Sequence, residues 1–197
     1  TYTGPTTIVG GMLQAQDGVG LPTNSNLTLN GGTFQSSGTF TRTVGTGAGQ
    51  IQFLATSGLA AGSSKLTINL LGSPTLGAAP MNTSTLILSS ATALADVELV
   101  SPLSLGTTVG RTIQVDDNVL TSFDFATISG TLSGGIGAST IALTKTGEGN
   151  LILSGANTYT GSTQVSAGAL IVRSIGTLNA TSSNLGSNST NAGSLLL

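Results

Sequence analysis

The sequence predicts an all-β protein built as a solenoid of stacked coils. Short segments alternate apolar residues with hydroxyl or amide residues, as in Leu27-Thr28-Leu29-Asn30. Single glycines separate many of these segments at short intervals. A four-residue word at the start of the chain returns near its other end. These three observations, taken in turn below, support the same fold class.

The alternating segments are the expected strands. Period-two alternation in stretches rich in Thr, Ile, Val and Leu is typical of half-buried strands. Helical spacing is missing nearly everywhere, and the glycines would interrupt any long helix. In chain order the expected strands lie in NLTLNGG, GQIQFL, KLTINLLG, STLILSS, VELVSPLSLG, RTIQVDDN, STIALTKTG, GNLILSG, STQVSAG and ALIVRS.

The glycine spacing favours a solenoid over a β-sandwich. A sandwich usually carries hairpin signals such as Asn-Gly, and Asn30-Gly31-Gly32 offers one. Glycine suits the corners of a coil because it takes positive φ without steric cost, and stacked Thr and Asn side chains can form hydrogen-bonded ladders. With roughly twenty residues per coil, as in other solenoids, the chain would form about nine or ten coils. Near the end of the chain, corners are expected every six to eight residues, at Gly149, Gly155, Gly161, Gly168 and Gly176.

Composition excludes several classes of protein. The 197 residues include 29 Gly, 38% hydrophobic and only 6% charged residues, with no Cys, His or Trp. A disordered chain would be richer in charge and poorer in aliphatic residues, so we expect one folded domain. The net charge of −2 and five scattered basic residues argue against a nucleic-acid partner. No apolar run is long enough for a membrane-spanning helix, so no membrane insertion by this segment is expected.

The chain repeats itself at a fixed shift. TYTG stands at residues 1–4 and again at residues 158–161, so a shift of 157 positions aligns the two copies. A shift that preserves identities, one conservative exchange and a glycine is the signature of a repeat. The aligned pairs are Thr6 with Thr163, Ile8 with Val165, Gly11 with Gly168, and Leu13 with Leu170.

One segment resembles a known family. Residues 144–172, TKTGEGNLILSGANTYTGSTQVSAGALIV, resemble the autotransporter-associated β-strand repeat, also called the passenger-associated transport repeat. The shared features are a KTG lead, a G-N-L-x-L strand, SGANTYTG, and T-x-V-x-A-G-x-L. TYTGPTTIVGGMLQ at the N-terminus resembles the second half of the same repeat, and LTLNGGTFQ resembles its continuation. GTFTRTVGTGAGQIQF, RTIQVDDN and ISGTLSGG are similar to spacer units of large bacterial surface proteins.

The resemblance implies a right-handed parallel β-helix in an exported bacterial protein. In autotransporters such a helix forms the stalk of the passenger. On this basis we expect a single β-helical segment, residues 1–197, cut from a longer repeat protein. Its expected parts are a partial repeat at 1–35, a spacer unit at 36–143, a repeat at 144–172 and the start of the next unit at 173–197.

Catalysis has one candidate cluster. Asp116, Asp117 and Asp124, with Arg111 nearby, could act as acid and base, as clustered aspartates do in pectin-cleaving β-helices. Asp116-Asp117-Asn118 equally fits a tight turn, because Asp and Asn side chains bond nearby backbone amides. Without His or Cys the common nucleophile–base pairs cannot form. We favour the turn, and expect no catalytic residues and no enzyme.

No metal or cofactor site is expected either. The stretch at 134–137, Gly-Gly-Ile-Gly, begins like the calcium-binding nonapeptide of secreted solenoids, but Ser139 stands where Asp is needed. Glu148 lies alone between two glycines and is expected to face solvent. Four N-x-S/T triplets, to which we assign no role, begin at Asn26, Asn82, Asn179 and Asn188.

The two tyrosines of the TYTG words admit two interpretations. Exposed rings at Tyr2 and Tyr159 could stack on sugars, as an adhesin requires. Alternatively each ring packs at a corner of the coil and satisfies its hydroxyl locally. Recurrence at equivalent repeat positions favours the structural interpretation.

The expected function is therefore structural: a stalk or fibre segment of an extracellular or cell-surface bacterial protein. Coils that stack one after another could also aid secretion across the outer membrane. The alternative is an adhesin module that binds a host or matrix glycan or protein, and polysaccharide cleavage is a distant third. Open strand edges recruit other strands, and neither end shows a polar cap. The expected partners are therefore further repeats of the same chain or other copies stacked head to tail.

Overall fold

The computed structural model describes residues 2–135, 141–174, 185 and 195–196. The described residues form strands, turns and loops and contain no helix. The strands are β1 (Thr6–Ile8), β2 (Met12–Gln14), β3 (Leu27–Leu29), β4 (Thr33–Thr43), β5 (Ile51–Phe53), β6 (Ser57–Leu71), β7 (Thr85–Leu88), β8 (Val97–Leu99), β9 (Leu103–Ser104), β10 (Arg111–Gln114), β11 (Ala126–Ile128), β12 (Leu132–Ser133), β13 (Ile141–Thr146), β14 (Asn150–Leu153), β15 (Ser162–Val165), β16 (Ala169–Val172) and β17 (Leu195–Leu196).

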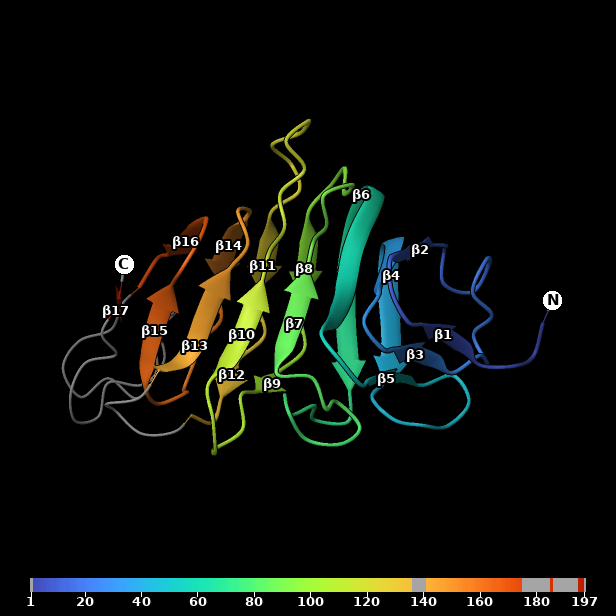
Figure 1. The fold of residues 1–197 in the computed structure, drawn as a ribbon, viewed down its shortest axis with the longest axis horizontal. Coiled ribbons are helices and arrows are strands. Elements are labelled where there is room, and N and C mark those ends of the chain that lie inside the picture. The colour runs from blue at the N-terminus through green and yellow to red at the C-terminus, as the bar shows by residue number, and fades with distance from the viewer. Residues whose placement is uncertain (1, 136–140, 175–184, 186–194, 197) are drawn as a thin grey trace.

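The strands pair in parallel and form rows along the molecule. One row runs β2-β4-β6-β7-β10-β13-β15-β17, and a second runs β4-β6-β8-β11-β14-β16. Shorter rows consist of β1-β3-β5 and β9-β12. Figure 1 shows β7, β10, β13 and β15 side by side, with β8, β11, β14 and β16 behind them. The prediction of an all-β chain is confirmed, and its mostly parallel strands are consistent with a solenoid.

The spacing of paired strands varies along the chain. Asn150 pairs with Ala169, 19 residues later, whereas Arg111 pairs with Leu143, 32 residues later. Several other steps also exceed the twenty residues assumed from sequence, so the expected nine or ten coils are not confirmed. Much of the added length lies in loops such as residues 115–125, which project beyond β11 in Figure 1.

Two long strands turn the corner between the two main rows without a break. In β4, residues 33–36 pair with residues 58–61 of β6, and residues 38–43 pair with residues 66–71. The register shifts between these blocks, so the residues in between are unpaired. The sequence predicted the second half of β6 but neither its first half nor β4.

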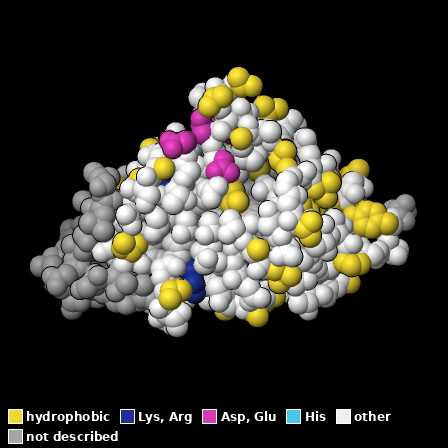
Figure 2. Space-filling model, in the orientation of Figure 1, with side chains coloured by type: hydrophobic (Ala, Val, Ile, Leu, Met, Phe, Trp, Pro, Cys, Tyr) yellow, Lys and Arg dark blue, Asp and Glu magenta, His cyan; other side chains and the backbone are white. Residues whose placement is uncertain are grey.

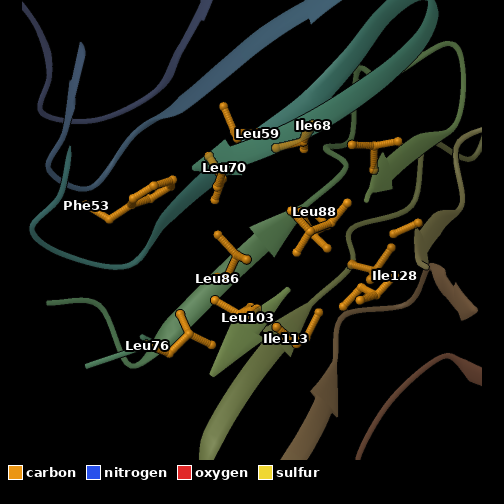
Figure 3. Packing of buried hydrophobic residues seen from close by; sticks show 14 of the residues in the cluster. Phe53, Leu59, Ile68, Leu70, Leu76, Leu86, Leu88, Leu103, Ile113 and Ile128 are labelled. Atoms are coloured by element: carbon orange, nitrogen blue, oxygen red, sulfur yellow. The ribbon is translucent and has the colours of Figure 1, made fainter. Parts of the chain in front are cut away.

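The core lies between the rows. Inward-facing residues alternate with more exposed ones, as in β5 and β8, where both apolar ends are buried and the middle residue is not. Figure 3 shows Leu59 and Ile68 of β6 and Leu86 and Leu88 of β7 directed into one apolar interior. Burial of such side chains stabilises the fold by about 1.5–3 kcal/mol each. The core is therefore continuous from one coil to the next.

Polar side chains also link neighbouring coils, as expected for a hydroxyl and amide ladder. The Gln52 side-chain amide on β5 donates to Thr28 Oγ1 on β3 (2.8 Å) and to Asn26 Oδ1 (3.2 Å). The Asn26 amide in turn donates to the carbonyls of Gly45 (3.2 Å) and Gly47 (2.8 Å). The first N-x-S/T triplet thus begins with a buried asparagine that is engaged within the fold.

Candidate functional site

The aspartate cluster forms the base of a projecting loop. The Asp124 carboxylate is buried and accepts a hydrogen bond from the backbone N–H of Asn118 (2.5 Å). The Asn118 side chain accepts from the N–H of Leu120 (3.1 Å) and donates to the carbonyl of Ala93 (2.7 Å). Of the residues in the turn interpretation, Asn118 makes the expected bond to a nearby backbone amide, and its bond to Ala93 ties the loop to a distant segment of the chain.

The remaining members of the cluster point elsewhere. Asp116 accepts a hydrogen bond from the Gln114 side chain (2.8 Å). Arg111 is buried, and its Nε donates to the carbonyl of Leu105 (3.1 Å). Its guanidinium occupies the space beside Gly77, where a Cβ would approach it within 2.4 Å. Among the described residues, no three His, Cys, Asp or Glu side chains gather as a metal site would require.

The other candidates from sequence are dispersed. Gly134 and Gly135 both adopt positive φ, while Ile136 to Ser139 lie outside the described residues. Glu148 is exposed, as expected. Asn82 is exposed as well, and the triplets at Asn179 and Asn188 lie outside the described residues.

A buried lysine that sequence analysis overlooked joins two coils of the repeat. Lys145 lies on β13 and is fully buried. Its ammonium donates to the carbonyls of Thr146 (2.9 Å) and Gly147 (2.7 Å), at the corner after its own strand. It also donates to the carbonyl of Ala167 (3.0 Å), at the corner after β15. Lys145 is the lysine of the KTG lead, and Ala167 belongs to the closing A-G of the same repeat.

Burial sets the protonation of Lys145. Desolvation lowers the pKa of Lys145 to about 8, although the charges of Glu148 and Asp116 act in the opposite direction. The sequence signal that could have revealed this buried lysine is its position between an apolar strand and a glycine corner. A lysine there is the donor that can reach several corner carbonyls at once.

We predict that stability rises between pH 8 and pH 10. In this window the unfolded chain, with an ordinary lysine pKa near 10.5, binds more protons than the folded chain, in which the pKa is about 8. Stability increases with pH wherever the unfolded state binds more protons. Above pH 10 the trend should reverse, because burial raises the pKa of Tyr159 to about 12. Chemical denaturation at pH 7, 8, 9 and 10 measures this. A free energy of unfolding that falls steadily across pH 8–10 would contradict it.

The two tyrosines make the same local contact. Tyr2 Oη and Thr6 Oγ1 share a hydrogen bond of 2.6 Å, and Tyr159 Oη and Thr163 Oγ1 share one of 2.6 Å. Tyr159 is 0% exposed and Tyr2 is 46% exposed. The two copies therefore share their local structure but differ in burial. Their threonine partners lie in different rows of strands: Thr6 is on β1, which pairs with β3, and Thr163 is on β15, which pairs with β13.

Removing the two hydroxyls should have unequal effects. We expect Tyr159→Phe to lower the free energy of unfolding by about 1–2 kcal/mol, because it leaves a buried Thr163 hydroxyl without its partner. Tyr2→Phe, the matched control, should cost less than about 0.5 kcal/mol, because water can replace the exposed partner. Urea unfolding of both variants measures the difference. Equal losses would show that the burial of Tyr159 has no energetic consequence.

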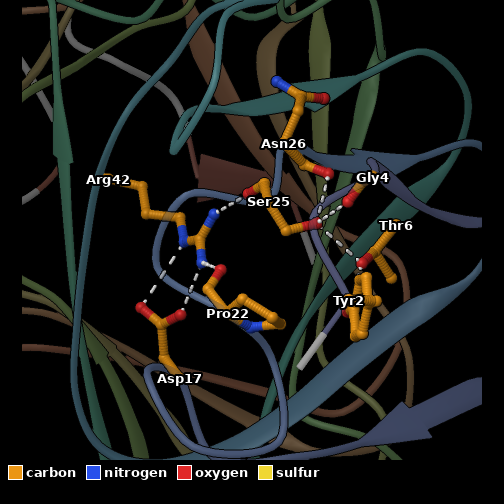
Figure 4. Close-up of polar contacts among 8 residues, drawn as sticks. All are labelled: Tyr2, Gly4, Thr6, Asp17, Pro22, Ser25, Asn26 and Arg42. Atoms are coloured by element: carbon orange, nitrogen blue, oxygen red, sulfur yellow. Dashed lines mark hydrogen bonds and ion pairs between the residues drawn. The ribbon is translucent and has the colours of Figure 1, made fainter.

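A polar network holds the loop between β2 and β3 against β4 (Figure 4). Arg42, buried on β4, bonds Asp17 Oδ1 through Nη2 (2.6 Å) and also donates to the carbonyls of Pro22 and Ser25. The guanidinium carbon lies 5.7 Å from the centre of the Phe40 ring. The loop that contains Asp17 and Ser25 thus packs against the second half of β4, residues 38–43, which pairs with β6 but not with β2.

The surface carries few charges. Figure 2 shows one face on which only a few side chains are charged. Lys65 bonds Glu98 (2.7 Å) and Asp96 (3.3 Å). The hydrogen bond with Glu98 raises the pKa of Lys65 and lowers that of Glu98. Nowhere in the described part of the chain does a helix occur that could cross a membrane.

Parallel rows of strands, and a motif that builds the same Tyr–Thr contact twice, define an all-β chain that contains a repeated motif. The family model of the passenger-associated-transport-repeat matches residues 1–15 and 143–172. The resemblance drawn from the sequence is thereby confirmed, and the chain carries this repeat at both places. Comparison with curated proteins found no match, and comparison with solved structures found none either.

Proposed function

We propose that this chain is a non-enzymatic structural segment of an exported bacterial surface or extracellular protein, where it acts as a stalk or fibre. One observation carries the proposal: the residues that define the repeat hold one coil on the next. Lys145, from the KTG lead, bonds the corner that contains Ala167. The repeat thus supplies stacking contacts along the length of a rod.

The continuous core supports a rod. Parallel strands joined by crossover connections are nearly always right-handed, so we take the coil as right-handed. Most separations between paired strands exceed twenty residues and reach 32, so the coils would number fewer than nine or ten. A stack of this kind is stabilised mainly by contacts between neighbouring coils.

Stacking from one end also suits secretion and assembly. Each coil that folds outside the outer membrane would lie on the previous one and resist backward movement of the chain. Among the described residues, β1 pairs only with β3 and β2 only with β4, which leaves the other edge of each strand for a further coil. We propose that further repeats of the same chain, or other copies, stack there head to tail. Such a joint does not close on itself and extends into a filament.

Single-molecule force spectroscopy tests the stalk proposal. The chain is pulled from its two ends, and the contour length released in each unfolding event is measured. Coils of 19 to 32 residues should release roughly 60–115 Å each, at about 3.3–3.6 Å per residue. A stalk predicts several events of this size. One event that releases the whole chain at low force would overturn the proposal.

An adhesin function is the second candidate. It would place a glycan or protein partner on the side of the rod, and it is the alternative that the sequence leaves open.

A further inference from the structure

The two copies of the repeat follow the same backbone course after the TYTG word. In the second copy, β15 leads to a corner at Gly168, which has a φ of 65°, and β16 follows. In the first copy, β1 leads to a corner at Gly11, which also has a φ of 65°, and β2 follows. The shift of 157 positions found in the sequence therefore aligns two units of the same form, each a strand, a corner and a second strand.

In the second copy a preceding coil covers this unit. β13 pairs with β15, and β14 pairs with β16. At the corner, the Lys145 ammonium donates to the carbonyl of Ala167 (3.0 Å), and the backbone N–H of Ser166 donates to the carbonyl of Lys145 (2.8 Å). A Cβ at Gly168 would lie 2.5 Å from the carbonyl oxygen of Gly149. One unit is thus seated on the other through both strands and through the corner between them.

In the first copy the corresponding groups are uncovered. Val9 is aligned with Ser166, and Gly10 is aligned with Ala167. Among the described residues, neither the Val9 N–H nor the Gly10 carbonyl makes a hydrogen bond. A Cβ at Gly10 or Gly11 would meet nothing within 4 Å. The first copy therefore offers the donor, the acceptor and the corner that the second copy uses to hold the preceding coil.

The tyrosines report the same difference. Tyr159 is 0% exposed, and its segment bonds a preceding coil through the N–H of Thr158 and the carbonyl of Leu132 (2.8 Å). Tyr2 is 46% exposed although it makes the same contact with its threonine. The units belong to different rows of strands, but seating depends only on the two strands and the corner between them. A preceding coil can therefore lie on either unit.

We propose that residues 6–14, here called the N-terminal face, bind a coil with the sequence of residues 141–157. The lysine of that coil donates its ammonium to the Gly10 carbonyl, and the carbonyl of the same lysine accepts from the Val9 N–H. Docking here rests on the proposed stacking of coils, and it adds which sequence lies on the face and which atoms recognise it. A coil without this lysine pairs with β1 and β2 but leaves the corner carbonyl unbonded.

An extended chain tests the proposal. A copy of residues 141–157 is joined ahead of Thr1, so that it precedes TYTG as it does in the second copy. Amide hydrogen exchange followed by NMR then reports on the Val9 N–H. Its exchange should be at least about fivefold slower than in the 197-residue chain, which is the effect of one hydrogen bond.

Two results would overturn the proposal. The first is Val9 exchange that is equally fast in the extended and the 197-residue chains. The second is protection of Val9 that appears in the 197-residue chain as its concentration rises, because a second copy would then occupy the face.

Variants of the extended chain separate the lysine contact from strand pairing. Lys145→Met in the added copy should lower the protection of Val9 severalfold, because the Gly10 carbonyl loses its donor. Glu148→Gln in the added copy changes an exposed residue of the same corner, so this matched control should keep the protection. Equal protection in the two variants would overturn the lysine contact. Gly11→Ala should abolish protection, because its Cβ would meet the added corner as a Cβ at Gly168 meets Gly149.

Failure of this docking site and failure of the stalk are distinguishable. The stalk is judged from the unfolding events of the 197-residue chain, to which the added coil does not contribute. Stepwise unfolding together with an unprotected Val9 N–H would remove the docking site alone. A single event at low force together with a protected Val9 N–H would remove the stalk alone.

Discussion

Replacing Lys145 with methionine should lower the free energy of unfolding by about 3 kcal/mol. Methionine keeps the apolar stem but removes the ammonium that bonds the carbonyls of Thr146, Gly147 and Ala167. The Thr146 carbonyl keeps its hydrogen bond from the backbone N–H of Val115 (3.0 Å), so the loss falls mainly on the other two carbonyls. A carbonyl left buried without a donor costs about 1–3 kcal/mol, and hydrogen bonds to charged groups are among the strongest. Part of the loss is offset because the variant no longer buries a charge. Urea unfolding followed by circular dichroism measures the change.

Lys65 provides the matched control. Its side chain is 48% exposed and pairs with Asp96 and Glu98 at the surface. Exposed ion pairs contribute about 0–1 kcal/mol, so Lys65→Met should cost less than about 1 kcal/mol. If both substitutions cost the same, Lys145 does not join the coils as proposed. The Lys145→Met variant should also lose the rise in stability between pH 8 and pH 10.

A second large effect is expected at the corner glycine of the repeat. Gly168 has a φ of 65°, and a Cβ there would lie 2.5 Å from the carbonyl oxygen of Gly149 and 2.6 Å from that of Gly147. Alanine would thus be strained in its own backbone and would also push two coils apart. We expect Gly168→Ala to cost at least about 3 kcal/mol, of which the positive φ accounts for about 1–2 kcal/mol.

Gly11 separates these two causes. It holds the equivalent repeat position with the same φ of 65°, but a Cβ there would meet nothing within 4 Å. Gly11→Ala should therefore cost only the backbone term, about 1–2 kcal/mol. The difference between the two variants measures how closely the coils approach at Gly168. Thermal unfolding of both proteins gives that difference, and no difference would mean that the coils are not in contact there.

Much of the fold follows from local pattern. Alternation such as that in Leu66-Thr67-Ile68, and the residues that follow each TYTG word, can be recognised within a short stretch of sequence. The strands that these patterns predict are present in the structure. The lengths of β4 and β6 were missed because both strands run through glycine and serine, which have low strand propensity on their own. Pairing with neighbouring coils on both sides overrides that propensity.

The buried polar groups could not be predicted in the same way. Arg42 and Lys145 look like surface residues in the sequence, and each is buried because carbonyls from distant segments converge on it. The register shift between β4 and β6 depends on how the two strands pair, which no local pattern encodes. The aspartate loop was anticipated because Asp and Asn bond neighbouring backbone groups, which is a local effect.

Stacking of parallel coils is the central claim, and distances between spin labels test it most directly. The described chain has no cysteine, so pairs of cysteines can be introduced and labelled cleanly. Successive pairings place one column of residues along the second row: Thr39, Thr67, Glu98, Thr127, Ile152 and Ile171.

Electron paramagnetic resonance would measure the distance from a label at Thr39 to a label at Thr127, Ile152 or Ile171. Neighbouring parallel strands lie about 4.8 Å apart. The account therefore predicts a distance that grows by ~5 Å at each step, to an α-carbon separation of roughly 24 Å at Ile171. Distances that stay constant or shorten from Thr127 to Ile171 would contradict the stacked arrangement.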